Sequence, residues 1–295
     1  RYLQQTNSPQ ATAAWIEVAH QHRDNLHVQR LALDASASWN DLEFIARLLE
    51  RLETDAAAPS LVWRTAKARY LLQSDSSDRA ASEAGRLLND VIAAAPTAVK
   101  PRLLAVQAYK RLGNYSAALE HLSAAANLKP RAPGPRLEMA ALLLAQGEDQ
   151  RARAVLEQVT AHGDLADDQQ RRAAALFGQL GEVNRAIGLV VAAHHGDELA
   201  ADLLLASLYR RANRLESAEA ICRRVLDESP SAAAVEFTAD LLASRGQIDE
   251  ARRVLDRLHT LDLEAGLAEL VRGSFAARHE GPQPALAAFR QATEI

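Results

Sequence analysis

Residues 113–130 read GNYSAALEHLSAAANLKP, a turn followed by an Ala- and Leu-rich segment that a proline closes. A turn residue with an alanine five positions later recurs at regular intervals along the chain. The recurrences are Gly147 with Ala152, Gly181 with Ala186, Asn213 with Ala218, and Gly246 with Ala251. Counted from Gly113, successive turn residues are 34, 34, 32 and 33 positions apart. A fixed period in this range is typical of a helical solenoid, whose stacked helix pairs form a long surface suited to holding a partner.

The unit between residues 99 and 130 shows how each repeat is expected to fold. Leu104, Ala108 and Leu112 fall on one face of a first helix. Gly113 ends that helix, because glycine readily adopts the positive φ found after a helix C-terminus. The apolar positions of a second helix follow, and they are Ala118, Leu119, Leu122 and Ala125. Pro130 closes the unit, since proline cannot continue a helix.

This unit resembles the tetratricopeptide repeat, a 34-residue helix-turn-helix. The matching features are an aromatic residue before the turn, small residues in the second helix around one large residue, and a terminal proline. They are carried by Tyr109, Ala118, Leu122, Ala125 and Pro130. One position departs from the family, because Arg102 stands where the repeat has its opening aromatic residue. The resemblance implies an all-α fold, a right-handed superhelical solenoid of about 17 helices built from such repeats.

The repeats vary in quality along the chain. Residues 99–262 carry well-formed repeats, residues 1–98 degenerate ones, and residues 263–295 an irregular last repeat around Gly281-Pro282-Gln283-Pro284. N-terminal helices are expected over 9–22, 26–38 and 41–52, and an enlarged turn over 74–78, where the sequence is Ser-Asp-Ser-Ser-Asp. We expect one continuous solenoid. Because the first helix lacks a partner, we also expect the chain to be a piece of a longer repeat protein.

Composition narrows the class of protein. Hydrophobic residues make up 48% of the 295 positions but aromatic residues only 4%, so Ala and Leu must do most of the packing. A net charge of −4 argues against a strongly basic nucleic-acid binder, and no nucleic acid is expected as a partner. There is no apolar run long enough to cross a membrane, so we expect no direct membrane insertion. Lysine is scarce beside arginine and alanine is abundant, a bias typical of bacteria rich in G and C.

No residue pattern indicates catalysis or cofactor binding. The nine histidines form no set at helical spacing with acidic residues, and one cysteine cannot build a cysteine-based zinc site. Cys222 falls where a second helix faces its neighbour, which favours a packing thiol over a nucleophile. Glycines occur singly at turns, so there is no phosphate-binding loop. We therefore expect no enzyme activity, no metal and no cofactor.

The resemblance implies that the inner, concave face of each first helix binds the partner. Carried onto this register, the candidates are Lys100, Leu103, Gln107, Lys110, Arg111, Leu137, Ala141, Leu144, Arg171, Gln179, Leu203, Ser207, Arg210, Arg211, Glu236 and Asp240. Their apolar centres and basic edges would fit a protein or peptide with acidic residues. The alternative is that these arginines form a solvated helix face. The family's clamp for C-terminal carboxylates is not expected, because Gln107 and Ala141 stand where it has asparagines.

Two functions fit these expectations. The first is a non-enzymatic scaffold for protein–protein interaction, similar in style to the bacterial envelope proteins of exopolysaccharide synthesis and export, whose repeats lie in the periplasm. The alternative is a cytosolic regulatory or sensor domain that binds a peptide in its concave groove. The sequence leaves the partner and the oligomeric state open, and it favours the periplasm over the cytoplasm only through this resemblance.

Overall fold

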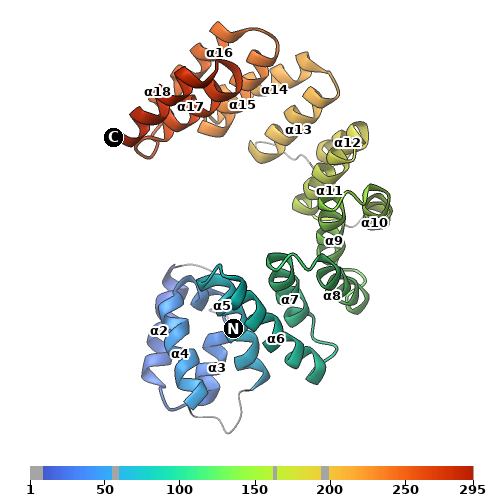
Figure 1. Ribbon diagram of the computed structural model, residues 1–295, viewed down its shortest axis with the longest axis vertical. Coiled ribbons are helices and arrows are strands. Elements are labelled where there is room, and N and C mark those ends of the chain that lie inside the picture. The colour runs from blue at the N-terminus through green and yellow to red at the C-terminus, as the bar shows by residue number, and fades with distance from the viewer. Residues whose placement is uncertain (1–8, 55–59, 162–164, 194–198, 295) are drawn as a thin grey trace. The chain divides into compact units, whose positions relative to one another are not determined.

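The computed structural model describes residues 9–54, 60–161, 165–193 and 199–294, and these residues form helices and connections without a strand (Figure 1). They contain 17 α-helices and two short 3₁₀ helices, which confirms the predicted all-α class and helix number. The helices up to the middle of the chain are α2 (Pro9–Gln21), α3 (Leu26–Asp34), η1 (Ser36–Asn40), α4 (Leu42–Thr54), α5 (Leu61–Ser74), α6 (Asp78–Ala94), α7 (Val99–Arg111), α8 (Tyr115–Leu128) and α9 (Pro133–Ala145). The others are α10 (Asp149–Ala161), α11 (Asp167–Gln179), α12 (Val183–Ala193), α13 (Leu199–Arg211), α14 (Leu215–Glu228), α15 (Ala232–Ser244), α16 (Ile248–Leu255), η2 (Asp256–Thr260), α17 (Leu267–His279) and α18 (Pro282–Glu294).

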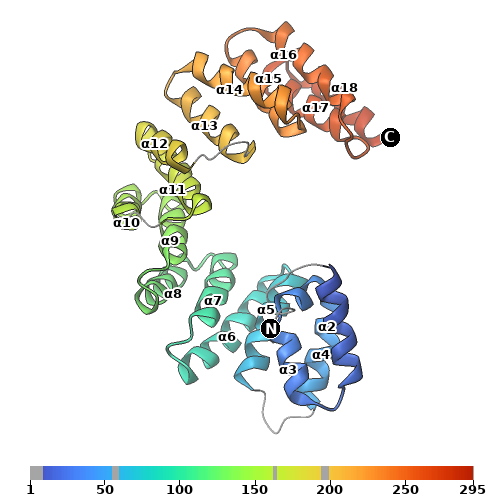
Figure 2. The same ribbon diagram turned by 180° about the vertical axis from the view of Figure 1, so that it is seen from behind.

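The chain divides into two compact units, Arg1–Leu142 and Leu143–Ile295. Within each unit, consecutive helices pack as pairs, such as α5 with α6 and α7 with α8 in the first unit, and α11 with α12 and α13 with α14 in the second. Both views of the ribbon show these pairs following one another in chain order within each unit (Figures 1 and 2). The domain boundaries expected from the sequence stay predictions.

Five of the turns inside the pairs share one hydrogen-bonding pattern. Gly113 has φ +69°, and the amide of Asn114 donates to the carbonyl of Tyr109 over 2.9 Å, as in a Schellman motif. Equivalent bonds join Glu148 to Leu143, Glu182 to Phe177, Arg214 to Tyr209, and Gln247 to Leu242. The turn residues have positive φ throughout, and they are Gly147, Gly181, Asn213 and Gly246. The turn chemistry predicted from the sequence is therefore confirmed at all five positions.

The alanine that lies five residues after each of these turns is buried between helices. These alanines are fully buried, each 0% exposed, and they are Ala118, Ala152, Ala186, Ala218 and Ala251. Four residues further on, the larger side chains are also buried, and they are Leu122, Leu156, Val190, Cys222 and Leu255. An alanine at the crossing lets two helices approach closely, and the larger side chain fills the adjoining space.

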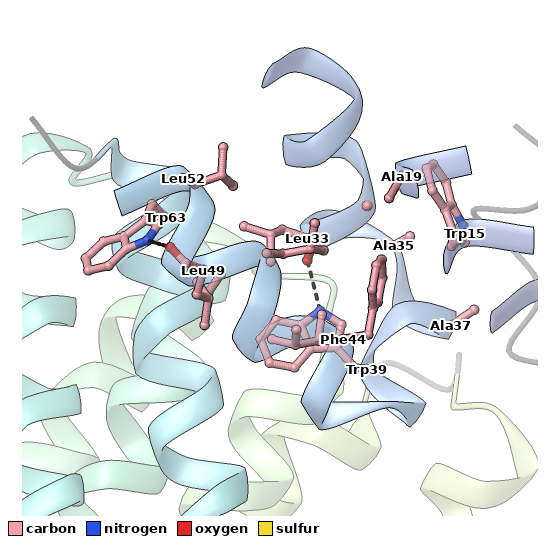
Figure 3. Close-up of a cluster of buried hydrophobic side chains, with 14 of the residues drawn as sticks. Trp15, Ala19, Leu33, Ala35, Ala37, Trp39, Phe44, Leu49, Leu52 and Trp63 are labelled. Carbon is pink, nitrogen blue, oxygen red and sulfur yellow. Dashed lines mark hydrogen bonds between the residues drawn. The ribbon is translucent and has the colours of Figure 1, made fainter. Parts of the chain in front are cut away.

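A dense apolar cluster holds the N-terminal helices together, and Figure 3 shows its aromatic side chains. The indole of Trp39 donates to the carbonyl of Leu33 over 2.9 Å, and the indole of Trp63 donates to the carbonyl of Leu49 over the same distance. The predicted helix over 26–38 is wrong at its end, because α3 stops at Asp34 and Trp39 lies in η1. The carbonyl of Leu33 has no helical partner beyond that stop, and the indole satisfies it.

The turn expected to be enlarged is an ordinary one. Only three residues, Asp75–Ser77, separate α5 from α6, as many as separate α7 from α8. The carboxylate of Asp75 accepts from the amide of Ser77 over 2.7 Å, and the hydroxyl of Ser77 caps α6 by accepting from the amide of Ala80. The polar residues that suggested a loop therefore start a helix, and the extra length lies in α6, which has 17 residues.

Arginines link successive helix pairs in the second unit. The pairs of side chains are Arg153 with Glu182, Arg185 with Glu157, Arg214 with Asn184, Arg245 with Glu219, and Arg252 with Glu280. Most of these side chains are partly exposed, so each of these interactions by itself contributes little to the stability of the fold. None of the described helices is both long and apolar enough to cross a lipid bilayer.

Candidate functional site

The first helices of neighbouring pairs contact one another within each unit. In the first unit α3 contacts α5 and α5 contacts α7, while in the second unit α11 contacts α13, α13 contacts α15, and α15 contacts α17. We call the outward-facing side chains of these helices, together with those of α9 up to Leu142, the A-helix surface of each unit. The residues predicted to bind a partner lie on these helices.

On α7 the five predicted positions are exposed, but three of them have partners within the chain. Lys100 binds Asp34 at the end of α3, with 2.9 Å between Nζ and Oδ1, and Lys110 pairs with Glu138 of α9. Arg111 donates to two carbonyl oxygens at the end of α5, those of Leu72 over 2.8 Å and Asp75 over 2.6 Å. The guanidinium of Arg111 therefore caps a neighbouring helix.

The other two predicted positions on α7 point to solvent. Leu103 is 38% exposed and Gln107 is exposed beside it, one helical turn further along. An exposed leucine next to a polar amide offers apolar contact and hydrogen bonding to an approaching chain. These two residues form an accessible part of the predicted surface in the first unit.

In the first unit an arginine, an aromatic ring and a carboxylate lie close together, although no sequence pattern connected them. The guanidinium of Arg69 on α5 lies 3.9 Å from the centre of the Trp39 ring. Burial lowers the pKa of Arg69, and the nearby carboxylate of Asp34 partly opposes that shift. Asp34 thus interacts with both Arg69 and Lys100. No sequence signal pointed to this group, because it joins residues from three different helix pairs.

The prediction is wrong for Leu137, which is 1% exposed and belongs to the core. Leu144 and Leu203 are half-buried, and Leu203 packs against the apolar cluster of the C-terminal helices. Apolar residues surround α9 on most of its circumference, so helical periodicity alone could not indicate which side faces the neighbouring helices. Arg171 on α11 is half-buried as well.

In the second unit the two predicted arginines of α13 have different surroundings. The guanidinium of Arg210 lies 5.0 Å from the centre of the Phe237 ring on α15, whereas Arg211 is exposed. The acidic candidates Glu236 and Asp240 are paired with α17: Arg278 lies 2.7 Å from Glu236 and 3.1 Å from Asp240. The hydrogen bond to Glu236 is the largest cause that raises the pKa of Arg278.

Asp240 has a second partner on α17. The Nε2 atom of His279 lies 3.0 Å from Oδ1 of Asp240, and its ring packs against Phe275. Charged side chains of α15 and α17 therefore neutralise one another across the A-helix surface. A partner that binds here must exchange these ion pairs for its own.

The described residues offer no grouping of three or more His, Cys, Asp or Glu side chains that could hold a metal ion. Cys222 is 1% exposed, and burial raises the pKa of its thiol. Its Sγ atom lies in the cluster that Ala206, Ala218 and Leu241 form. These surroundings suit the packing role that the sequence indicated for Cys222.

Comparisons with known proteins agree with this architecture. Residues 111–180 match the tetratricopeptide repeat family model, a segment that covers less than half of the chain. A search of the curated proteins found no match.

Solved structures with a similar fold cover most of the chain. A tetratricopeptide repeat protein from Parabacteroides merdae has a TM-score of 0.57 at 17% identity, over 77% of this chain and 93% of that one. Yeast Tom70 has a TM-score of 0.60 at 14% identity, over 97% of this chain and 58% of Tom70. A chain of the Cut9–Hcn1 hetero-tetramer of the APC/C has a TM-score of 0.58 at 15% identity, over 96% of this chain and 52% of that one. At such identities these likenesses show the fold alone, which is that of tetratricopeptide repeat proteins.

Proposed function

We propose that this chain is a non-enzymatic scaffold that binds protein partners on its A-helix surface and holds them within a larger assembly. The observation that carries the proposal is the continuity of this surface across three or more helix pairs in each unit, combined with exposed apolar and polar side chains at Leu103, Gln107 and Arg211. A surface of this length suits an extended or helical segment of another protein.

The charges of the surface favour a partner with acidic residues. Lys100 and Asp34 keep 54% and 68% of their side-chain areas exposed, so their ion pair contributes little to stability and can open at low cost. A carboxylate of the partner can replace Asp34 beside Lys100, or Glu138 beside Lys110, without leaving a buried charge unpaired. Within the described residues Arg211 forms no ion pair with a carboxylate, and it would bind such a group directly.

The assembly that we propose is one of the bacterial envelope, of the kind that makes and exports exopolysaccharide, with the chain in the periplasm. This finer proposal rests on the style of the repeats. Cell fractionation of the source bacterium with an antibody against the chain tests it. Recovery with the periplasm or envelope supports the proposal, while recovery in the cytosol would favour a regulatory or sensor domain instead.

Partner binding can be tested with pairs of variants, in which a substitution on the A-helix surface is compared with the same substitution at a similarly exposed residue elsewhere. Leu103→Glu changes α7 on the A-helix surface, and Leu128→Glu changes α8, where the leucine is equally accessible at 37%. Arg211→Glu on α13 is compared in the same way with Arg253→Glu, an exposed arginine of α16. In pull-downs from the source bacterium, capture should fall for Leu103→Glu and Arg211→Glu and persist for the two controls. Equal capture by all four folded variants would contradict the proposed surface.

A further inference from the structure

A small pocket lies in the first unit between the C-terminal part of α2 and the middle of α4, two helices that do not form the A-helix surface. Its volume is about 160 Å³. The apolar part of its lining consists of the buried side chains Ala19, Phe44 and Leu48. The remaining lining residues are His20, Arg23, Arg47 and Arg51, of which the first three are exposed and the last is half-buried.

Neutral acceptors hold two of the three guanidinium groups around this pocket. Arg23 lies 2.9 Å from Nδ1 of His20, and because a guanidinium only donates, this imidazole nitrogen must accept. Arg51 donates to the side-chain oxygen of Gln29 over 3.5 Å, and Gln29 is itself buried, with its amide group bound to the carbonyls of Ala19 and His22. Both of these acceptors are uncharged, and the contacts orient the two arginines.

Within the part of the chain that the structure describes, no ion pair joins Arg23 or Arg47 to a carboxylate. Elsewhere in the chain, arginines such as Arg153, Arg245 and Arg278 are paired with Glu or Asp, and the whole chain carries a net charge of −4. Guanidinium groups and apolar side chains therefore line the same pocket. It attracts carboxylates, which guanidinium groups bind in a fork-like geometry.

We propose that this pocket, which we call the α2–α4 pocket, docks an acidic segment of a partner protein. One apolar side chain of that segment enters the pocket, and carboxylates on either side of it bind Arg23 and Arg47. The volume supports this occupant, because an engineered cavity of about 150 Å³ holds a benzene molecule and hence matches one leucine or phenylalanine side chain. A small inorganic anion would leave the apolar lining unfilled. The site is separate from the A-helix surface and gives the scaffold a second point of attachment.

The test uses the full chain and the fluorescein-labelled peptide acetyl-Glu-Glu-Leu-Glu-Glu-amide, with binding followed by fluorescence anisotropy. Arg23→Gln and Arg47→Gln should each weaken binding about fivefold, the contribution expected of one exposed ion pair. Arg86→Gln is the matched control, an exposed arginine of α6 away from the pocket. Arg51 is left unchanged because it contacts Gln29.

Two further peptides separate pocket binding from simple charge attraction. Replacing the central leucine by alanine should weaken binding, and replacing the four glutamates by lysines should abolish it. Equal affinity for the leucine and alanine peptides, full competition by millimolar inorganic phosphate, an equal effect of Arg86→Gln, or no binding at all would each overturn the proposal. The peptide assay depends on Arg23 and Arg47, whereas the pull-downs that test the A-helix surface depend on Leu103 and Arg211, so failure of this proposal and failure of the proposed function can be told apart.

Discussion

Gly266, which precedes α17, has a backbone that only glycine fits. Its φ is +79°, and a Cβ atom added there would lie 2.7 Å from the carbonyl oxygen of Ala292 in α18. Gly246 has the same φ of +79°, yet nothing lies within 4 Å of its added Cβ. An alanine at either position would therefore have the same unfavourable left-handed backbone. The two positions differ only in the contact that the added Cβ atom makes with the neighbouring helix.

This comparison predicts the size of both effects. Gly246→Ala should lower the free energy of unfolding by about 1–2 kcal/mol, the cost of an L-residue in the left-handed region. Gly266→Ala should lose this amount and about 1–3 kcal/mol more, because the backbone oxygen of Ala292 cannot rotate away and α17 or α18 must shift. The total loss expected for Gly266→Ala is about 2–5 kcal/mol.

Urea unfolding followed by far-ultraviolet circular dichroism measures both losses. A third variant, Gly188→Ala, calibrates the series, because Gly188 lies inside α12 with open space around it and without positive φ. This variant should gain up to about 1 kcal/mol from helix propensity. If Gly266→Ala and Gly246→Ala lose the same stability, the reasoning about the contact between α17 and α18 is refuted.

Arg111→Gln should lower the free energy of unfolding by about 1 kcal/mol because two carbonyls of α5 lose their donor, while Arg211→Gln should change it by less than about 0.5 kcal/mol; urea unfolding compares them. Cys222 should react with Ellman's reagent in the native protein far more slowly than in urea, since its thiol is buried and its pKa is raised. Burial lowers the pKa of His121, so the unfolded chain binds more protons and stability should fall as pH drops from about 7 towards 6. His121→Gln should reduce that fall, and an unchanged pH dependence would contradict the burial of the ring.

Local rules explain what the sequence could predict. A residue with positive φ follows the first helix in five of the pairs, and an alanine five residues later is fully buried, so Gly113 and Ala118 could be assigned from the chain alone. Both requirements act within a few residues of the turn. The helix number followed from the same period.

Contacts that reach beyond a single helix explain what the sequence could not predict. The end of α3 depends on a bond from Trp39 to the carbonyl of Leu33, and the role of Arg111 depends on the end of α5 lying within its reach. The burial of Leu137 depends on which side of an almost wholly apolar helix meets its neighbours. Residue spacing along one helix contains none of this information.

The apolar cluster of the N-terminal helices has a consequence for spectroscopy. The chain has three tryptophans, and Trp15, Trp39 and Trp63 all lie in this one cluster. Intrinsic fluorescence excited at the indole band therefore reports on the N-terminal helices alone and is blind to the repeats between α10 and α18. In a repeat protein whose helix pairs depend mainly on their neighbours, fluorescence and circular dichroism need not give the same unfolding midpoint. Their difference would measure how strongly the N-terminal helices are coupled to the rest of the chain.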